Sequence, residues 1–408
     1  MGTRYQSRRE LRGLLDAYKE LRVDGGGAYI RLSSLENLKA VDAIVFDCDG
    51  VLIDARRSYD AAIRKSIQHI FTSLTGCRMP LSIIPIDVIY NLRLSGGFNF
   101  DWDSTYVITL MLFTSLPKDF QKAFSEVAQR LEGKTATQRL VSASSTLRGK
   151  LPKDYFQREG SKIKQKLKQL TETKIADKDA AVGLLLQLAE REGYLQHLRD
   201  FIRFLNYPSE AKQSIISTVF DEFFYGAELF KQIYGFKGEL GVKHGLIEKE
   251  ERIVSLETLK ALTEMLGEGR LGLATGRGSL AAKKTLGEAL NYFNSKAMVF
   301  LEDLKYKMGG RDDLIRPYVK PEPYSLLEAV ASIGGTNAVL YVGNSSEDFI
   351  LVNKANKVKN IFLFAGCYAL QNHSGKMLNL FAEAKAEMIL PTVNALPKVL
   401  KVIKGEQG

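Results

Sequence analysis

The stretch Ile44-Val45-Phe46-Asp47-Cys48-Asp49-Gly50-Val51-Leu52-Ile53-Asp54 is the part of the sequence that decides the fold. Its apolar start predicts a buried strand that ends on two carboxylates. Because side chains alternate along a strand, Asp47 and Asp49 are expected to point to the same side. Glycine tolerates backbone angles that other residues avoid, so Gly50 allows the chain to turn out of the sheet. The acid pair suits a metal ion or a phosphoryl group, and an ordinary strand with an Asp-Gly turn fits this stretch equally well.

Length and composition indicate a soluble globular protein of two or three domains. The chain has 408 residues, of which 45% are hydrophobic and 25% charged. Its net charge of +10 favours anionic partners but does not choose between phosphometabolites, RNA and acidic surfaces. The three cysteines form no CxxC pair, which argues against a disulfide framework or a zinc site and for a cytoplasmic setting. No apolar run is long enough to span a bilayer, so membrane insertion is not expected.

The pattern of apolar residues predicts an α/β core interrupted by a long helical insertion. Residues 5–22 have helical periodicity, so residues 1–40 are expected to form a helical extension. Short apolar runs that alternate with helical segments predict a doubly wound parallel sheet. Its later strands are expected at 270–274, 297–301, 338–342, 361–364 and 387–390. The core would then comprise 41–55 and 251–408, and the insertion 56–250, with loops expected at 94–106, 132–151 and 225–245.

Three more polar motifs follow along the chain, and two of them stand at the ends of expected strands, where ligands of open α/β sheets bind. Thr275-Gly276-Arg277 combines a hydroxyl with backbone N–H groups and suits an anion, although many ordinary turns contain Thr-Gly. Lys320 precedes a proline that would start a helix. Gly343-Asn344-Ser345-Ser346-Glu347-Asp348 offers the oxygen ligands that Mg²⁺ prefers.

In this order, the four motifs resemble those of the haloacid dehalogenase-like (HAD) superfamily of phosphohydrolases, with the helical insertion placed as a cap domain. The resemblance implies that Asp47 attacks phosphorus and forms an aspartyl phosphate, and that Asp49 is the general acid and base. Thr275 and the Gly276 amide would hold the phosphoryl oxygens, and Lys320 would neutralise charge there and orient Asp47. Apart from the resemblance, Arg277 is a candidate for contact with a substrate phosphate, and a surface arginine at the start of a helix fits its position equally well.

The same resemblance implies a Mg²⁺ cofactor bound by Asp47, Asp49, Asn344 and Asp348. Most members of the superfamily carry an aspartate where this chain has Asn344. Either Asp348 then becomes the main acidic ligand, or the affinity for Mg²⁺ is lower than with an aspartate.

Substrate specificity is assigned to the cap, because phosphate-handling groups alone cannot distinguish one ester from another. The candidate residues are Phe98, Asn99, Asp101 and Trp102, although Trp102 in a core and Asp101 as a helix cap fit the pattern too.

The function expected from these motifs is a Mg²⁺-dependent phosphatase that acts on a small phosphorylated metabolite. Two alternatives stay open: a phosphomutase of the same superfamily, and a catalytically weak protein that binds a phosphate ligand. A nucleic-acid substrate is ranked last because the basic runs lack interleaved aromatic residues. The oligomeric state is left open, with a homodimer as one option.

Overall fold

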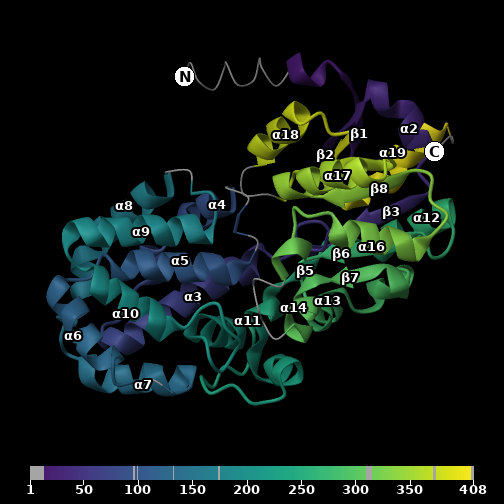
Figure 1. Cartoon of the computed structure of the whole chain (residues 1–408). Helices are drawn as coiled ribbons and strands as arrows, with labels where there is room; N and C mark the ends of the chain where they lie inside the picture. The colour runs from purple at the N-terminus through teal and green to yellow at the C-terminus, as the bar shows by residue number, and fades with distance from the viewer. Residues whose placement is uncertain are drawn as a thin grey trace. The chain divides into compact units, whose positions relative to one another are not determined.

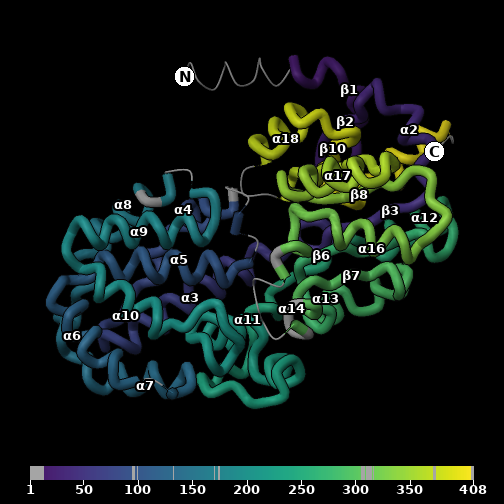
Figure 2. The backbone as a smooth tube through the Cα atoms, in the orientation of Figure 1, coloured from purple at the N-terminus to yellow at the C-terminus, as the bar shows by residue number. Residues whose placement is uncertain are grey.

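The computed structural model of the chain describes residues 13–94, 97–98, 100–131, 133–172, 175–308, 315–370 and 374–405. These residues form two compact units, whose paths can be followed in Figures 1 and 2. The core unit contains residues 13–56, 250–308 and 315–405, and the helical unit contains residues 57–249.

An eight-stranded sheet forms the centre of the core unit, in the order β1-β2-β10-β9-β8-β3-β6-β7. The six strands from β10 to β7 are parallel, and β1 and β2 are antiparallel to their neighbours. This confirms the predicted α/β class with a mostly parallel sheet. The strands are β1 (Tyr18–Val23), β2 (Gly26–Arg31), β3 (Ala43–Phe46), β6 (Leu271–Thr275), β7 (Met298–Phe300), β8 (Val339–Gly343), β9 (Phe362–Cys367) and β10 (Met388–Leu390).

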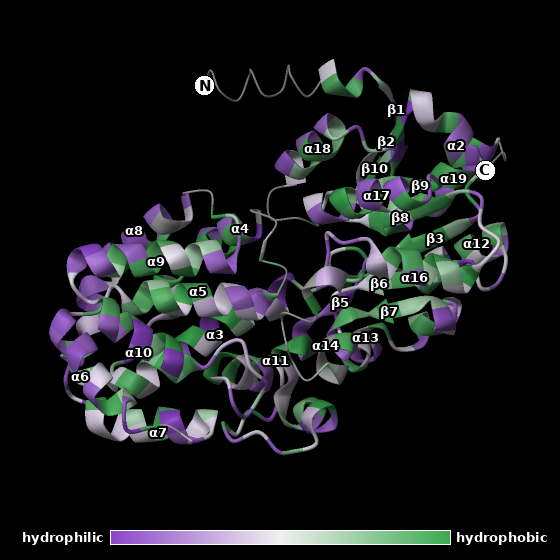
Figure 3. Ribbon diagram, in the orientation of Figure 1, coloured by the Kyte–Doolittle hydropathy of each residue, from purple (hydrophilic) through white to green (hydrophobic). Residues whose placement is uncertain are grey.

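Helices cover the sheet of the core unit on both faces. Helices α16 (Tyr324–Ile333), α17 (Ser346–Val358) and α18 (Ser374–Glu383) share one apolar cluster with alternate residues of the strands. Helices α2 (Leu35–Lys39), α12 (Leu256–Leu266) and α19 (Leu396–Lys404) pack against one another on the other side. Every residue of β3, β6 and β8 is buried, and these strands are coloured as hydrophobic in Figure 3. Burial on both faces explains why these strands are continuous apolar runs.

The predicted helix over residues 5–22 is wrong from Tyr18 onward, and residues 1–12 lie outside the described ranges. Tyr18–Val23 forms strand β1, which pairs with β2 and extends the main sheet. Gly25 and Gly26 turn the hairpin with φ values of 85° and 145°, which other residues rarely adopt. The Tyr18 hydroxyl donates a hydrogen bond to the carbonyl oxygen of Ala386 at 2.9 Å. Pairing with the distant strand β10 thus outweighs the local helical periodicity, and the expected helical extension is instead an edge of the sheet.

The helical unit contains nine named helices in its described residues, and α5 lies at its centre. Every residue of α5 after Asp101 is buried, which is typical of a helix enclosed by others. None of the helices in the described ranges combines the length and apolar character needed to cross a membrane. The helices are α3 (Arg56–Thr75), α4 (Ile86–Leu94), α5 (Asp101–Phe113), α6 (Lys118–Ala128), α7 (Ala136–Leu147), α8 (Tyr155–Glu172), α9 (Lys178–Glu192), α10 (Leu195–Leu205) and α11 (Ile215–Tyr234).

Two of the predicted loops in this unit contain helix. Residues 132–151 contain α7, which begins with a capping box between Thr135 and Gln138 that the loop assignment overlooked. Helix α11 continues to Tyr234, interrupted at Gly226, whose φ of 71° is not helical. A Cβ atom at Gly226 would lie 2.3 Å from the backbone nitrogen of Gly245. Gly226 and Gly245 thus let two backbone segments approach closely.

Candidate active site

Asp47 lies at the carboxyl end of the central strand β3, between the ends of β6 and β8. Phe46 pairs with Leu273 of β6 and with Val342 of β8. The backbone N–H of Asp47 donates to the carbonyl oxygen of Val342 at 2.9 Å. The next residues of the neighbouring strands include Thr275 and Gly343, so the sheet brings three of the predicted motifs to one edge.

A tight turn after Asp47 carries Asp49 out of the sheet. The carbonyl oxygen of Cys48 accepts hydrogen bonds from the backbone N–H groups of Leu52 and Ile53, at 2.8 and 3.0 Å. Gly50 has a φ of 77°, as its place in the Asp-Gly turn requires. The Asp49 side chain is 33% exposed, whereas Cys48 is fully buried. The turn therefore presents Asp49 at the surface of the site and directs Cys48 into the protein.

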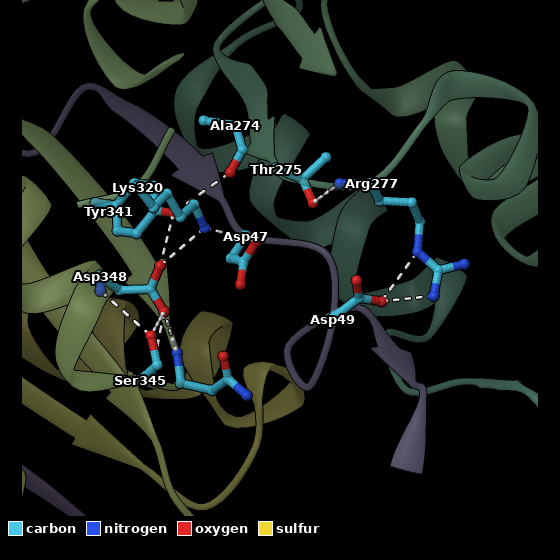
Figure 4. A network of polar contacts seen from close by, with 10 residues as sticks. Asp47, Asp49, Ala274, Thr275, Arg277, Lys320, Tyr341, Ser345 and Asp348 are labelled. Atoms are coloured by element: carbon cyan, nitrogen blue, oxygen red, sulfur yellow. Dashed lines mark hydrogen bonds and ion pairs between the residues drawn. The ribbon is translucent and has the colours of Figure 1, made fainter. Parts of the chain in front are cut away.

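Lys320 joins Asp47 to Asp348 beneath the strand ends (Figure 4). Its ammonium nitrogen Nζ lies 2.8 Å from Oδ1 of Asp47 and 2.9 Å from Oδ1 of Asp348. Burial alone would favour the neutral amine, but the two carboxylates raise the pKa of Lys320 well above its usual value. Burial raises the pKa of Asp47 to about 7, and Lys320 opposes this rise. A buried, fully charged lysine thus holds one oxygen of the candidate nucleophile.

Both carboxylate oxygens of Asp348 accept hydrogen bonds from the protein. Oδ2 accepts the backbone N–H groups of Asn344 and Ser345 and the Ser345 hydroxyl, at 3.0, 3.1 and 2.8 Å. Oδ1 accepts Lys320 and the hydroxyl of Tyr341, at 2.9 and 3.1 Å. Burial would raise the pKa of Asp348, but Lys320 and these donors lower it. With both oxygens occupied, Asp348 holds Lys320 in place.

Two neighbours of this network were not predicted to belong to it, although Glu347 stands in the motif that ends with Asp348. Tyr341 lies in the middle of β8, fully buried, and its hydroxyl is 3.1 Å from Oδ1 of Asp348 and 3.3 Å from the carbonyl oxygen of Ala274. The signal for it was a tyrosine inside an otherwise aliphatic strand. Glu347 is half-buried beside Asp348. Burial and the charge of Asp348 raise the pKa of Glu347 to about 8, against the opposing charge of Lys320.

The Thr275-Gly276-Arg277 motif divides into an anion-binding part and a buried ion pair. The backbone N–H of Gly276 makes no hydrogen bond to any residue that the structure describes, and Gly276 is half-buried. Thr275 is buried, and its hydroxyl oxygen accepts the backbone N–H of Arg277 at 3.2 Å. The Arg277 side chain is 0% exposed and binds Asp49 and Glu250, so the expectation that it reaches a substrate phosphate is not met. The guanidinium donates to the side chains of Asp49 and Glu250, with a fork-shaped pair to Glu250, and not to a substrate phosphate.

The residues predicted to determine substrate specificity lie in the helical unit. Asp101 and Trp102 form hydrogen bonds with other side chains of that unit. Asp101 accepts a hydrogen bond from Arg93 at 2.7 Å, and Nε1 of Trp102 donates to Asp221 at 2.8 Å. Phe98 is buried, and Asn99 lies outside the described residues. These contacts match the alternative in which Trp102 belongs to a core; a substrate-binding role of the four residues stays a prediction.

The oxygen atoms at the strand ends are of the type that binds a Mg²⁺ ion together with a phosphate. Both oxygens of Asp348 already accept hydrogen bonds, so its role as a metal ligand stays a prediction. The described residues contain no group of three or more His, Cys, Asp or Glu side chains placed to hold a metal. What is left is the carboxylate of Asp47, the backbone carbonyl of Asp49 and the amide of Asn344, whose side chain makes no hydrogen bond within the described residues. Mg²⁺ often binds through one or two carboxylates, waters and substrate phosphate oxygens, so this set is sufficient only with the substrate present.

Comparisons with known proteins support the fold. No protein-family model matches the chain, and no curated protein matches it either. An X-ray structure from the Northeast Structural Genomics Consortium is similar with a TM-score of 0.60 and 18% identity, covering 90% of this chain and 100% of its own. Phosphatase Tt82 from Thermococcus thioreducens has a TM-score of 0.46 and 19% identity, covering 83% of this chain and 98% of its own. At such identities, the first of these likenesses establishes a shared α/β architecture with a helical region and nothing further.

Proposed function

We propose that the protein is a HAD-like phosphatase that hydrolyses a small phosphate monoester through an aspartyl-phosphate intermediate. The observation that carries the proposal is the chain Asp47–Lys320–Asp348 at the carboxyl ends of β3 and β8. A carboxylate fixed by a buried lysine at such an edge is suited to receive a phosphoryl group. Asp49 lies in the turn after β3, and Gly276 follows the neighbouring strand β6. The N–H of Gly276 donates no hydrogen bond to any described residue.

Asp47 is the nucleophile in this proposal. Lys320 occupies Oδ1, which leaves Oδ2 to attack phosphorus as the bond from phosphorus to the ester oxygen breaks. The ammonium charge favours the ionised carboxylate, whereas burial favours the protonated form that cannot attack. Because these effects oppose each other, the reactive form of Asp47 is gained as the pH rises through about 7.

Asp49 moves the protons. In the first step it donates a proton to the leaving ester oxygen, and in the second it accepts one from the water that attacks the aspartyl phosphate. Hydrolysis then releases inorganic phosphate and restores both carboxyl groups. The Asp49 side chain is partly exposed and lies two residues after the nucleophile, which allows it to meet the leaving group while Asp47 meets phosphorus.

The charge that develops on the phosphoryl oxygens is met by Lys320, by the Gly276 N–H and by the hydroxyl of Thr275. Asp47, the Asp49 carbonyl and Asn344 would hold Mg²⁺, which supplies further positive charge to the phosphoryl oxygens when it is bound. Asn344 contributes an oxygen without a negative charge, so we expect weaker Mg²⁺ binding than an aspartate would give.

The test is release of inorganic phosphate from p-nitrophenyl phosphate and from a panel of phosphorylated metabolites, with and without Mg²⁺. Wild type should release phosphate from at least one compound, and Asp47→Asn should lose at least about 1,000-fold, because the nucleophile is gone. Folding of the variant is checked by circular dichroism. A well-folded Asp47→Asn protein with unchanged turnover would contradict the proposal, as would a wild type that is inactive on the whole panel.

A further inference from the structure

We propose that Arg277, braced by Glu250, is a positioning residue that fixes the Asp49 carboxyl group and leaves one of its two oxygens to face the leaving group. The inference rests on the proposed function and adds to it a residue that does not touch the substrate. Arg277 donates hydrogen bonds to both Asp49 and Glu250, and Figure 4 shows Arg277 directed at Asp49.

Two N–H groups of Arg277 converge on a single oxygen of Asp49. Nε and one terminal nitrogen of Arg277 donate to Oδ1 at 2.9 and 2.6 Å. No residue in the described ranges donates a hydrogen bond to Oδ2 of Asp49. The clamp thus leaves one oxygen for proton transfer and keeps the other occupied.

Glu250 fixes the guanidinium that fixes Asp49. The two terminal nitrogens of Arg277 donate to the two oxygens of Glu250, each at 2.8 Å, which is the fork-to-fork geometry of a strong pair. Both side chains are 0% exposed. The hydroxyl of Thr285 also donates to Glu250, at 2.9 Å. A buried charge held on several sides has little freedom to rotate, so Arg277 is a rigid support for the partly exposed carboxylate of Asp49.

The local chain path explains why this support is needed. Asp49 precedes Gly50 in a short turn that ends in β4 (Ile53–Asp54), which pairs with the two-residue strand β5 (Glu251–Arg252). Glu250 directly precedes β5, so Arg277 ties the turn that carries Asp49 to the segment beside it in the core unit. Without the tie, the Asp49 side chain could rotate away from the leaving oxygen, and a small misplacement lowers the rate of proton transfer.

Comparing two substrates with different leaving groups distinguishes a loss of Asp49 positioning from a general loss of active-site structure. A good leaving group departs without a proton, whereas an alkoxide needs one. We therefore measure kcat/KM for p-nitrophenyl phosphate and for benzyl phosphate with wild type and with Arg277→Lys, which keeps the charge but not the fork. The double variant Arg277→Met/Glu250→Gln removes both buried charges together and serves if Arg277→Lys does not fold. Arg139→Lys is the matched control, a buried arginine in the helical unit that donates to three backbone carbonyls.

The expected loss with either Arg277 variant is on the order of 10- to 100-fold for benzyl phosphate and less than about 3-fold for p-nitrophenyl phosphate. Arg139→Lys should leave the ratio of the two substrates unchanged. An equal loss on both substrates in a folded Arg277 variant, or no loss on either, would overturn the inference while leaving the proposed function intact. A wild type that hydrolyses neither ester would overturn the proposed function, and the inference with it.

Discussion

The hydroxyl of Tyr341 offers a sensitive probe of the buried network, because Tyr341→Phe removes one hydrogen-bond donor and leaves the ring packing unchanged. The hydroxyl is 3.1 Å from an oxygen of Asp348 and 3.3 Å from the carbonyl oxygen of Ala274. A hydrogen bond to a charged group contributes about 1.5–3 kcal/mol to stability. Asp348 keeps its other hydrogen-bond donors in the variant. The free energy of unfolding should therefore fall by about 1.5 kcal/mol, the lower end of that range, which changes the folding equilibrium constant about tenfold.

Tyr18→Phe is the matched control within the same unit. Its hydroxyl donates to a neutral carbonyl oxygen, that of Ala386, at 2.9 Å, so its removal should cost about 1 kcal/mol or less. Both variants are unfolded in urea and followed by far-ultraviolet circular dichroism, and kcat is measured with p-nitrophenyl phosphate. We expect Tyr341→Phe to be less stable than Tyr18→Phe and to have a lower kcat, since Asp348 positions Lys320. If Tyr341→Phe were as stable as the control and fully active, the reasoning that links Tyr341 to Asp348 would be refuted.

Three further predictions concern pH, metal and backbone. Burial raises the pKa of Asp47 to about 7, so kcat/KM should fall as the pH is lowered through 7; a profile flat from pH 5 to 8 would contradict this. Asn344→Asp adds a carboxylate to the metal position and should raise the affinity of the free protein for Mg²⁺, measured by calorimetry; an unchanged affinity would show that position 344 is not a ligand. Gly226→Ala would place Cβ 2.3 Å from the Gly245 nitrogen and should destabilise the helical unit by about 1–3 kcal/mol, followed by Trp102 fluorescence in urea. Gly183→Ala is its control, because Gly183 lies within α9 and an added Cβ would meet no neighbouring atom within 4 Å outside its own helix. This control variant should be more stable than wild type by about 0.5–1 kcal/mol. Equal stability of the two variants would refute the close approach of Gly226 to Gly245.

The sheet was predictable from the sequence because its strands carry their own signal. Buried parallel strands are short apolar runs, and five of the predicted strands begin within one residue of those observed. The acids and the hydroxyl follow these runs directly, so parallel pairing brings Asp47, Asp49 and Thr275 to one edge without further information. The hairpin at Tyr18 was missed because its conformation depends on pairing with β10, more than 350 residues away, which no local pattern records.

The ion pairs and hydrogen bonds between charged side chains at the site could not be predicted from the sequence. Arg277 looked like a residue that follows an anion-binding turn, but its partners Asp49 and Glu250 are 228 and 27 residues away along the chain. Asp348 looked like a metal ligand because of its carboxylate, yet a capping box with Ser345 and the approach of Lys320 and Tyr341 occupy both oxygens. For both residues the sequence indicates a charged side chain near the strand ends, but it does not indicate which partners that side chain binds. The partners depend on how distant elements pack together.

Trapping of the covalent intermediate tests the central claim most directly. Wild-type protein is mixed with p-nitrophenyl phosphate and Mg²⁺, quenched in acid within the first turnover, digested and analysed by mass spectrometry. The account predicts a phosphoryl group on the peptide that contains Asp47, and none in the Asp47→Asn variant. Rapid phosphate release by wild type without any phosphorylated Asp47 peptide, together with full activity of Asp47→Asn, would contradict it.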